Sequence, residues 1–376
     1  MTNPNQNPVP KLVHVLRNDA LGGVEHSTLE VVRYLASQGI QQQVIFLSPL
    51  AGGISKKFQI ENISVFSVPF TKAKFFSFIF LYWLHLKKFQ PEVQLVSGAF
   101  GLHALLAIIA RFSGVKRCWT YLIMGPATHG LPYFTQCLMG QISRIFSIGE
   151  IAVSEHLKSM FMKIMHVPKS RINVIHRWRD IATIYNHANI ARNNNKSVSP
   201  IILSIGRLDW TKDYKNLINA FSIFVVHEPR SIFNVVGEGH LRTHLENQIN
   251  DLNLNKSVFF LGHKNDVATL LGKSDIFLFS TSPTEGIGNV MIEAMAAGTP
   301  MICTDVGPCR EVMGNGIGGM LVPAGDPEAL AQAMLTLWRD PIKRQKLAVQ
   351  AHEFASQRYT KEVCGKQLMN LLFPAR

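Results

Sequence analysis

The sequence predicts an α/β protein built from two doubly wound domains, and three observations support this prediction. Short apolar runs of strand length alternate with amphipathic segments of helical period along most of the chain. Such alternation is typical of parallel sheets that carry helices on both faces. A polar, asparagine-rich stretch interrupts the alternation, and the same order of strand and helix then begins again. The length of 376 residues suffices for two domains of about 150–200 residues each.

We therefore expect four parts along the chain. They are an N-terminal domain over residues 1–186, a linker over 187–200, a C-terminal domain over 201–350 and a final helix over 351–376 that packs back toward the N-terminal domain.

The N-terminal half contains apolar runs of five to eight residues that we expect to be strands. In chain order they are "KLVHVL", "QQVIFLS", "VQLVSGA", "CWTYLIMG" and "INVIH". The segments between them have the apolar spacing of helices. They are "GGVEHSTLEVVRYLASQG", "FFSFIFLYWLHLKKF", "LHALLAIIARFSG" and "IAVSEHLKSMFMKIM".

The C-terminal half repeats the pattern. Expected strands are "IILSIGRLDW", "FNVVGEG", "VFFLG", "DIFLFSTS" and "MICTD". Expected helices are "YKNLINAFSIFVVHE", "LRTHLENQINDL", "DVATLLGKSD" and "NVMIEAMAA". Gly298 and Pro300 directly follow the last of these helices, as is usual where a helix stops.

Composition and charge narrow the class of protein. The N-terminus has no signal-peptide pattern, and no run reaches the roughly 18 apolar residues of a membrane span. The five cysteines are scattered along the sequence. We therefore expect a cytoplasmic protein with reduced thiols. The net charge of +13 is uneven: residues 1–188 hold 19 Lys+Arg against 8 Asp+Glu, and residues 189–376 hold 19 against 17. A basic half suits an anionic membrane or a phosphorylated substrate. No nucleic-acid-binding motif is present, so we expect no nucleic acid partner.

Two glycine turns follow the first expected strand of each half. Gly22 and Gly23 begin a helix in one, while Gly206, Arg207 and Lys212 occupy the same place in the other. Exposed amides at a helix start attract anions, and arginine and lysine add donors suited to phosphate oxygens. Neither turn has the dinucleotide glycine fingerprint or a Walker lysine, which argues against NAD and P-loop functions. The alternative is a surface turn with solvated basic residues.

A third glycine turn, "GEG", contains Gly237 and Gly239 and reads more simply as a tight turn than as a binding site. The stretch "TEGIGNVMIEAMAAGTP" offers more chemistry, because Glu285 lies in a turn and Glu293 lies inside the following helix. A carboxylate accepts hydrogen bonds from neighbouring sugar hydroxyls. Glu285 is therefore a candidate ligand of a transferred sugar, and Glu293 of a ribose. The alternative for Glu293 is that it only complements the positive helix start.

Taken together, these motifs resemble the retaining nucleotide-sugar glycosyltransferases of family 4, which have the GT-B fold. The resemblance covers nearly the whole chain, through "GGVE", "GRLDWTK", "GEG", "FLGHKNDV", "SPTEGIGNVMIEAMAAGTPMICTDVGPCREV" and "LVPAGDPEALAQAM". It implies two Rossmann-like domains that face each other across a cleft. It also implies a metal-free transfer with retention at the anomeric carbon, a UDP- or GDP-linked sugar as donor, and no bound cofactor or metal.

The resemblance assigns roles residue by residue. Arg207 and Lys212 would bind the donor diphosphate and stabilise the leaving group, and Glu285 would contact the donor sugar. Glu293 would bind the ribose and Gly23 would face the donor phosphates. The remaining donor-pocket positions lie in turns and at helix starts: Gly237, Asn265 to Val267, and Gly286, Ile287, Gly288 and Asn289.

Two positions depart from the family pattern. Met124 stands where members commonly have a histidine, and we expect His129, ahead of His103, to supply the polar contact instead. "RWRD", Arg177 to Asp180, replaces the frequent Asn-Gly-Val-Asp, and we expect Trp178 to pack rather than to shape an acceptor pocket.

We expect the basic N-terminal domain to take the acceptor, a saccharide or lipid-linked saccharide of bacterial cell-surface polysaccharide or lipopolysaccharide synthesis. The helical segment "FFSFIFLYWLHLKKF" with Lys72, Lys74, Lys87 and Lys88 at its ends is a candidate for contact with the inner face of the cytoplasmic membrane. We also expect most of this helix to be buried against the N-terminal sheet with its lysines snorkelling at the ends, which is compatible with membrane contact by the basic half. Rival functions are a catalytically silent sugar-nucleotide-binding partner, a sugar-nucleotide epimerase, and a phosphorylase, whose pyridoxal lysine has no candidate here.

Overall fold

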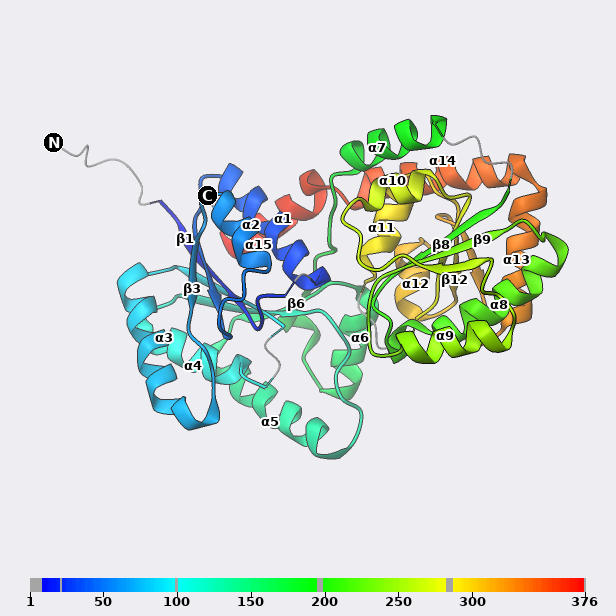
Figure 1. The fold of residues 1–376 in the computed structure, drawn as a ribbon. Coiled ribbons are helices and arrows are strands. Elements are labelled where there is room, and N and C mark those ends of the chain that lie inside the picture. Colours follow the sequence, from blue (N-terminus) through cyan, green and yellow to red (C-terminus); the bar gives the residue numbers. More distant parts are fainter. Residues whose placement is uncertain (1–8, 21, 99–100, 195–198, 282–286, 375–376) are drawn as a thin grey trace. The chain divides into compact units, whose positions relative to one another are not determined.

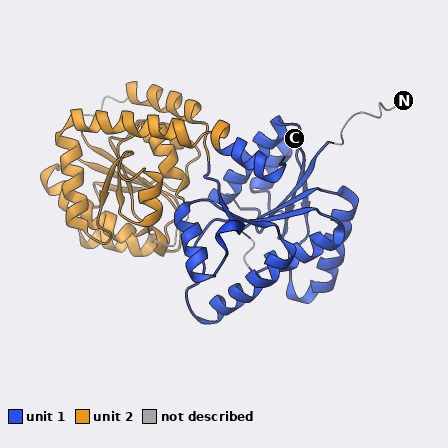
Figure 2. Ribbon diagram, turned by 180° about the vertical axis from the view of Figure 1, so that it is seen from behind, with its two compact units in different colours: residues 1–177, 364–376 blue, residues 178–363 orange. Residues whose placement is uncertain are grey.

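The computed structural model describes residues 9–20, 22–98, 101–194, 199–281 and 287–374 (Figure 1). The chain divides into two compact units, coloured separately in Figure 2. Unit 1 comprises Met1–Arg177 and Cys364–Arg376, and unit 2 comprises Trp178–Val363. The division therefore lies earlier than the expected boundary at residue 186. Only the end of the expected final helix, from residue 364, groups with unit 1.

Unit 1 is built on a seven-stranded, all-parallel sheet with the order β3-β2-β1-β4-β5-β6-β7. The strands are β1 (Lys11–Leu16), β2 (Gln41–Phe46), β3 (Ser64–Ser67), β4 (Val93–Ser97), β5 (Arg117–Leu122), β6 (Gly149–Ala152) and β7 (Ile172–Val174). β1, β2, β4 and β5 confirm four of the predicted strands, and β7 the fifth. β3 was not predicted because it is a short edge strand with mostly exposed side chains, which leaves no apolar run to detect. β6 was not predicted either, and its last two residues belong to the segment "IAVSEHLKSMFMKIM" that was expected to be helical throughout.

Helices cover both faces of this sheet (Figure 1). They are α1 (Gly23–Ser37), α2 (Ile54–Ile60), α3 (Phe75–Phe89), α4 (His103–Ser113), α5 (Gly130–Phe146), α6 (Glu155–Ile164) and α15 (Lys366–Leu372). On one face, α3 and α4 pack on Val13, Val15 and Val96. On the other face, α1 and α2 pack on Leu16 and Phe46. The alternation of side chains along β1 thus feeds two separate apolar layers.

Unit 2 has a six-stranded, all-parallel sheet with the order β10-β9-β8-β11-β12-β13. The strands are β8 (Ile201–Ile205), β9 (Ile232–Val236), β10 (Val258–Phe260), β11 (Ile276–Phe279), β12 (Met301–Thr304) and β13 (Met320–Val322). The helices are α7 (Ile181–Asn193), α8 (Tyr214–His227), α9 (Arg242–Asp251), α10 (Val267–Gly272), α11 (Asn289–Ala296), α12 (Gly307–Val312), α13 (Pro327–Arg339) and α14 (Pro341–Arg358). Single-turn helices complete the two units: η1 (Lys72–Lys74), η2 (Lys169–Arg171), η3 (Trp210–Lys212) and the π-helical η4 (Lys361–Gly365).

The linker prediction over residues 187–200 is wrong where α7 runs. α7 has only three buried residues, Ile181, Ala188 and Ala191, so its sequence looks polar. Asp180 caps its first turn by accepting from Thr183 N, and Arg192 donates to the carbonyl oxygens of Ala297 and Gly298 beyond the end of α11. A surface helix with one narrow apolar stripe is easily mistaken for a loop.

One apolar cluster of unit 2 lies between the sheet and helices α8, α9 and α13. It contains the fully buried Phe221, Phe224 and Phe233. Burial of each such side chain contributes roughly 1.5–3 kcal/mol. In the described part of the chain, none of the helices has both the length and the apolar character needed to cross a membrane.

Candidate functional site

The strand order of unit 2 reverses between β8 and β11, the first strand and the fourth strand of the unit. In doubly wound sheets ligands bind outside the carboxyl ends of the two strands that flank this reversal. The loop after β8 carries Arg207 and Lys212, and the loop after β11 leads to the start of α11. The fold therefore brings together the two sequence motifs predicted to bind a nucleotide-sugar.

Two hydrogen bonds join these loops directly. Thr281 Oγ1 donates to the carbonyl oxygen of Thr211 at 2.9 Å, and Ser280 Oγ donates to Asp213 Oδ2 at 3.2 Å. Burial raises the pKa of the Asp213 carboxyl despite the hydrogen bond from Ser280. These two bonds hold the basic loop against the residues that follow β11.

Lys212 and Gly288, which directly precedes α11, both lie against the ring of Phe279, the last residue of β11. The Lys212 ammonium lies 4.4 Å from the centre of the Phe279 ring, a cation–π distance. On the same ring, a Cβ added to Gly288 would lie 2.6 Å from Phe279 Cζ, closer than real Cβ atoms come. Gly288 is thus required for close packing of the helix start against Phe279. Lys212 and the α11 amides consequently belong to one packed arrangement at the carboxyl edge of the sheet.

Arg207, one of the predicted donor ligands, is highly accessible to solvent. Its side chain is 75% exposed and its Nη2 lies 3.1 Å from Asp209 Oδ2. Asp209 also caps η3 by accepting from Thr211 N. An exposed ion pair of this kind is worth about 0–1 kcal/mol, so a phosphate group can recruit the arginine at little cost.

Glu293 lies on α11 and forms an ion pair that the sequence did not predict. Arg179 Nε donates to Glu293 Oε1 at 2.7 Å, with side-chain exposures of 10% and 20%. Glu285 and Gly286 lie outside the described residues. Ile287 and Gly288 are buried immediately before the helix, and Asn289 is its first residue. The only sequence signal for Arg179 was its place in the unusual "RWRD" segment.

The remaining donor-pocket candidates also follow carboxyl ends of strands. Gly237 has φ +136°, and a Cβ there would lie 1.9 Å from the Gly206 carbonyl oxygen. The close contact between the two turns is therefore enough to explain why residue 237 is a glycine, and no bound ligand is needed for that explanation. Asn265 is exposed and Val267 begins α10, whose first turn Asp266 caps through Thr269 N.

Unit 1 has the same kind of strand reversal, between β1 and β4, and Gly23 begins α1 beside it, exposed to solvent. The loop after β1 also contains Asp19, which the sequence analysis did not select. Its carboxylate accepts from the backbone amides of Ala51, Gly52, Gly53 and Ser55 and from Ser55 Oγ, at 2.7–3.1 Å. Although burial alone would raise it, the pKa of Asp19 is lowered by these hydrogen bonds. Asp19 thus fixes the loop that precedes α2.

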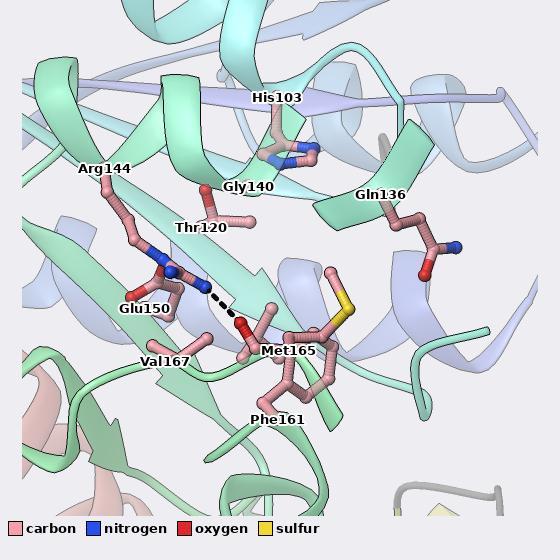
Figure 3. Close-up of a pocket in the computed structure, with 10 residues that line it drawn as sticks. His103, Thr120, Gln136, Gly140, Arg144, Glu150, Phe161, Met165 and Val167 are labelled. Carbon is pink, nitrogen blue, oxygen red and sulfur yellow. Dashed lines mark hydrogen bonds between the residues drawn. The ribbon is translucent and has the colours of Figure 1, made fainter. Parts of the chain in front are cut away.

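The two histidine candidates of unit 1 differ in environment. His129 is exposed just before α5, where its Nδ1 lies 2.9 Å from Thr128 Oγ1. Met124 is 47% exposed. His103 lines a small cavity of about 30 Å³ between the sheet and α4, α5 and α6 (Figure 3). Burial lowers the pKa of His103 to about 4, so it is neutral at pH 7.

Glu150 and Arg144 line the same cavity, where Arg144 Nη2 donates to the Met165 carbonyl oxygen at 2.8 Å (Figure 3). Burial raises the pKa of Glu150, an effect that the nearby Arg171 and Arg144 oppose. The cavity is otherwise walled mainly by apolar side chains such as Leu122 and Phe161.

Two helices of unit 1, α3 and α5, each carry an exposed apolar stripe. On α3 the buried side chains are Phe78, Tyr82, Leu86 and Phe89. The opposite side of α3 exposes Phe76, Phe80, Leu81 and Leu84, and α5 exposes Leu131, Phe134, Leu138 and Ile145, each 47–83% exposed. The prediction that most of the α3 segment is buried is therefore wrong for one of its sides. α4 lies between α3 and α5 and contacts both (Figure 1).

Trp178 is buried, as expected for a packing residue. Among the residues placed by the structure, no three His, Cys, Asp or Glu side chains gather into a metal-type cluster.

Comparison with known proteins finds a family match for each half of the chain. Residues 21–183 match the model "Glycosyltransferase Family 4", and residues 186–354 match "Glycosyl transferases group 1". The lipopolysaccharide core biosynthesis glycosyltransferase LpsE of Rhizobium meliloti is 30% identical over 46% of this chain and 50% of its own length. The capsular polysaccharide biosynthesis glycosyltransferase CapM of Staphylococcus aureus is 25% identical over 71% of this chain and 73% of its own length. The chain thus spans about half the length of its relative LpsE.

Solved structures share the fold over nearly the whole chain. Anabaena HepE, in complex with UDP and glucose, has a TM-score of 0.84 at 19% identity and covers 97% of this chain and 100% of its own. WaaG, a glycosyltransferase involved in lipopolysaccharide biosynthesis, has a TM-score of 0.75 at 15% identity, with coverages of 97% and 100%. Two doubly wound parallel sheets, the strand reversals and the two family matches identify the chain as a member of the family 4, group 1 glycosyltransferases with the GT-B fold.

Proposed function

We propose that the protein is a retaining, metal-independent glycosyltransferase that moves a sugar from a UDP- or GDP-sugar to a saccharide or lipid-linked saccharide acceptor. The observation that carries the proposal is the packing of Lys212, Phe279 and Gly288 at the strand reversal of unit 2, with Arg207 beside them. The solved HepE complex contains UDP and glucose, which supports UDP as the carrier. Relatives in lipopolysaccharide and capsule synthesis support a cell-surface glycan as product.

In this proposal the chain acts on the leaving group. The diphosphate gains negative charge as the bond to the sugar breaks. Arg207, Lys212 and the amides of Ile287 to Asn289 would stabilise that charge, the kind of preorganised electrostatics that dominates many enzymes. Glu285 would orient the donor sugar, Glu293 the ribose, and Asn265 to Val267 the base. In unit 1, Gly23 would offer amides to the donor phosphates, and His129 would contact the sugar or acceptor.

A binding experiment tests the donor part. Thermal unfolding is measured with UDP, GDP, ADP, dTDP or NAD, in EDTA. At about 100 times its dissociation constant a ligand stabilises by roughly 2.7 kcal/mol, so one diphosphate should raise the melting temperature clearly. The Arg207→Ala variant should lose both that shift and turnover, while Glu285→Ala should lose turnover and keep most of the shift. No shift with any diphosphate, or a shift with NAD, contradicts the proposal.

We further propose that the exposed apolar side chains of α3 and α5 contact the anionic inner surface of the cytoplasmic membrane. Exposed apolar side chains flanked by lysines insert into the headgroup region and are held there by charge. Lys72, Lys74 and Lys88 lie at the ends of α3, and Lys87 packs over Trp83. The surplus of positive charge in residues 1–188 supports an anionic surface.

Cosedimentation with vesicles tests this surface. Vesicles containing phosphatidylglycerol should bind the protein at low salt, and the double variant Phe76→Ser/Phe134→Ser should bind markedly less. Ile342→Ser is the matched control, because Ile342 is 82% exposed but lies in unit 2. Equal loss in the control, or no binding by the parent protein, contradicts membrane contact.

A catalytically silent sugar-nucleotide-binding partner is the second candidate function, favoured by Met124 at the usual histidine position. Release of free UDP from UDP-sugar together with a glycosylated acceptor excludes it. An epimerase would instead change the sugar without an acceptor. Nucleotide binding without turnover on any donor and acceptor pair would favour the silent partner.

A further inference from the structure

We propose that Arg179 is a positioning residue, which holds the Glu293 carboxylate in the orientation that binds the donor ribose. This inference rests on the proposed function of Glu293 and extends it to a residue outside the family pattern. Arg179 belongs to the "RWRD" segment at the start of unit 2, and Glu293 lies 114 positions later in α11. Only the tertiary fold brings them together.

The contact has the geometry of a strong hydrogen bond. Arg179 Nε lies 2.7 Å from Glu293 Oε1, and the two side chains are only 10% and 20% exposed. Hydrogen bonds between ionised partners are about twice as strong as neutral ones, and reduced contact with water limits screening. This pair therefore restricts the Glu293 side chain far more than an exposed surface pair would.

Arg179 is itself held from two sides. Its Nη1 donates to the Trp178 carbonyl oxygen at 2.8 Å, and its backbone N donates to the Tyr359 carbonyl oxygen at 2.9 Å. Trp178 is 3% exposed and Tyr359 is 1% exposed. Tyr359 Oη donates in turn to the Val312 carbonyl oxygen at 3.1 Å, which ties this anchor to the end of α12. The backbone and the guanidinium of Arg179 are thus both held by buried neighbours, which favours a fixed orientation of the Glu293 carboxylate.

The pair leaves Glu293 able to bind sugar hydroxyls. An ionised carboxylate only accepts hydrogen bonds and has about four lone-pair sites. Arg179 donates to Oε1, which takes one of them. A ribose hydroxyl can therefore bind Glu293 without displacing Arg179. The opposite arrangement, in which Arg179 competes with the nucleotide for Glu293, predicts tighter nucleotide binding when Arg179 is changed.

The test compares two ligands that differ by one hydroxyl. Dissociation constants are measured for UDP and 2′-deoxy-UDP, or for GDP and 2′-deoxy-GDP if GDP is the diphosphate that binds. The parent protein should prefer the ribonucleotide by about tenfold, the scale of one hydrogen bond to a charged group. Arg179→Lys keeps the charge but not the planar fork, so it should lower this ratio to about twofold or less. Both dissociation constants are measured on the same preparation of each variant. A fraction of unfolded protein therefore affects both equally and cancels in their ratio.

Two further variants fix the interpretation. Arg339→Lys changes an arginine whose Nε lies 3.5 Å from Glu228 Oε1, in an exposed pair on α13 and the end of α8, and should leave the ratio unchanged. Glu293→Gln should remove the preference. If Glu293→Gln removes it and Arg179→Lys does not, or if Arg179→Lys binds the ribonucleotide more tightly, the positioning role is wrong while the proposed function stands. If the parent protein binds both nucleotides equally, the ribose role of Glu293 fails, and the inference fails with it.

Discussion

Replacement of Gly237 by alanine should disrupt the junction of two turns at the candidate site. Gly237 follows β9 and has φ +136°, a backbone conformation that side chains rarely adopt. Its N donates to the Gly262 carbonyl oxygen at 2.9 Å, and Gly206 N donates to the Val236 carbonyl oxygen at 2.9 Å. A Cβ on residue 237 would lie 1.9 Å from the Gly206 carbonyl oxygen. The turn that carries Arg207 would have to move by about 1 Å to admit it.

Two costs add in the Gly237→Ala variant. Backbone strain of a non-glycine residue in such a region costs about 1–3 kcal/mol, and forcing an extra methyl group into a packed contact costs about 1–3 kcal/mol. The free energy of unfolding of unit 2 should therefore fall by about 4 kcal/mol. A domain of this size loses about 2–4 °C of melting temperature per kcal/mol, so the expected decrease is roughly 8–16 °C.

Calorimetry of the full chain measures the decrease, with Gly325→Ala as the control. Gly325 also has positive φ, +70°, but a Cβ there would meet nothing within 4 Å. The control carries the strain alone and should lose only about 1–2 kcal/mol. Nucleotide binding should weaken in Gly237→Ala, because Arg207 moves, and stay unchanged in Gly325→Ala. Equal losses of stability in the two variants would refute the clash with Gly206.

Three further predictions concern unit 1. Asp19→Asn removes the ionised acceptor of several hydrogen bonds and should lower the free energy of unfolding by about 3 kcal/mol, measured by urea titration; a loss below 1 kcal/mol would contradict the role of this carboxylate. Burial lowers the pKa of His14 to about 4, so only the unfolded chain takes up a proton between pH 6.5 and 4. Stability should fall by about 3 kcal/mol over that range, and by less in His14→Gln; an identical pH profile would exclude His14 as the cause. The raised pKa of Glu150 predicts that stability decreases as pH rises from 4.5 through the folded value, and that Glu150→Gln flattens this slope; an unchanged slope would mean that the cavity is better solvated than its burial indicates.

Local patterns in the sequence determined much of this architecture. Strands such as β1 and β8 are buried apolar runs, and helices such as α1 and α8 have a regular apolar stripe, so their residue order alone indicates them. The order of these elements also predicts a parallel sheet, because each strand is followed by a helix that crosses back. The motifs with Arg207, Lys212 and Glu293 were identifiable because they occupy the ends of predicted strands and the helix that follows.

Elements with weak local signals were decided by the tertiary structure. α7 looks like a linker because most of its residues face solvent, yet its few apolar contacts and the Arg192 bonds hold it in unit 2. β3 is an edge strand with mostly exposed side chains, and it depends on β2 for its hydrogen bonds. Such elements form because a neighbour offers a surface or a strand edge, and the sequence of the element itself does not record that neighbour.

The same distinction applies to the candidate site. The sequence supplied residue types of the right chemistry, but not their partners. That Lys212 lies over Phe279, that Gly237 meets Gly206, and that Arg179 binds Glu293 are contacts between residues 31–114 positions apart. Periodicity and motif spacing report only on near neighbours along the chain, whereas pairing at the strand reversal follows from the order of strands in the sheet. The sequence therefore determined which chemistry is available to the site, and the tertiary structure decided how those groups are oriented and held.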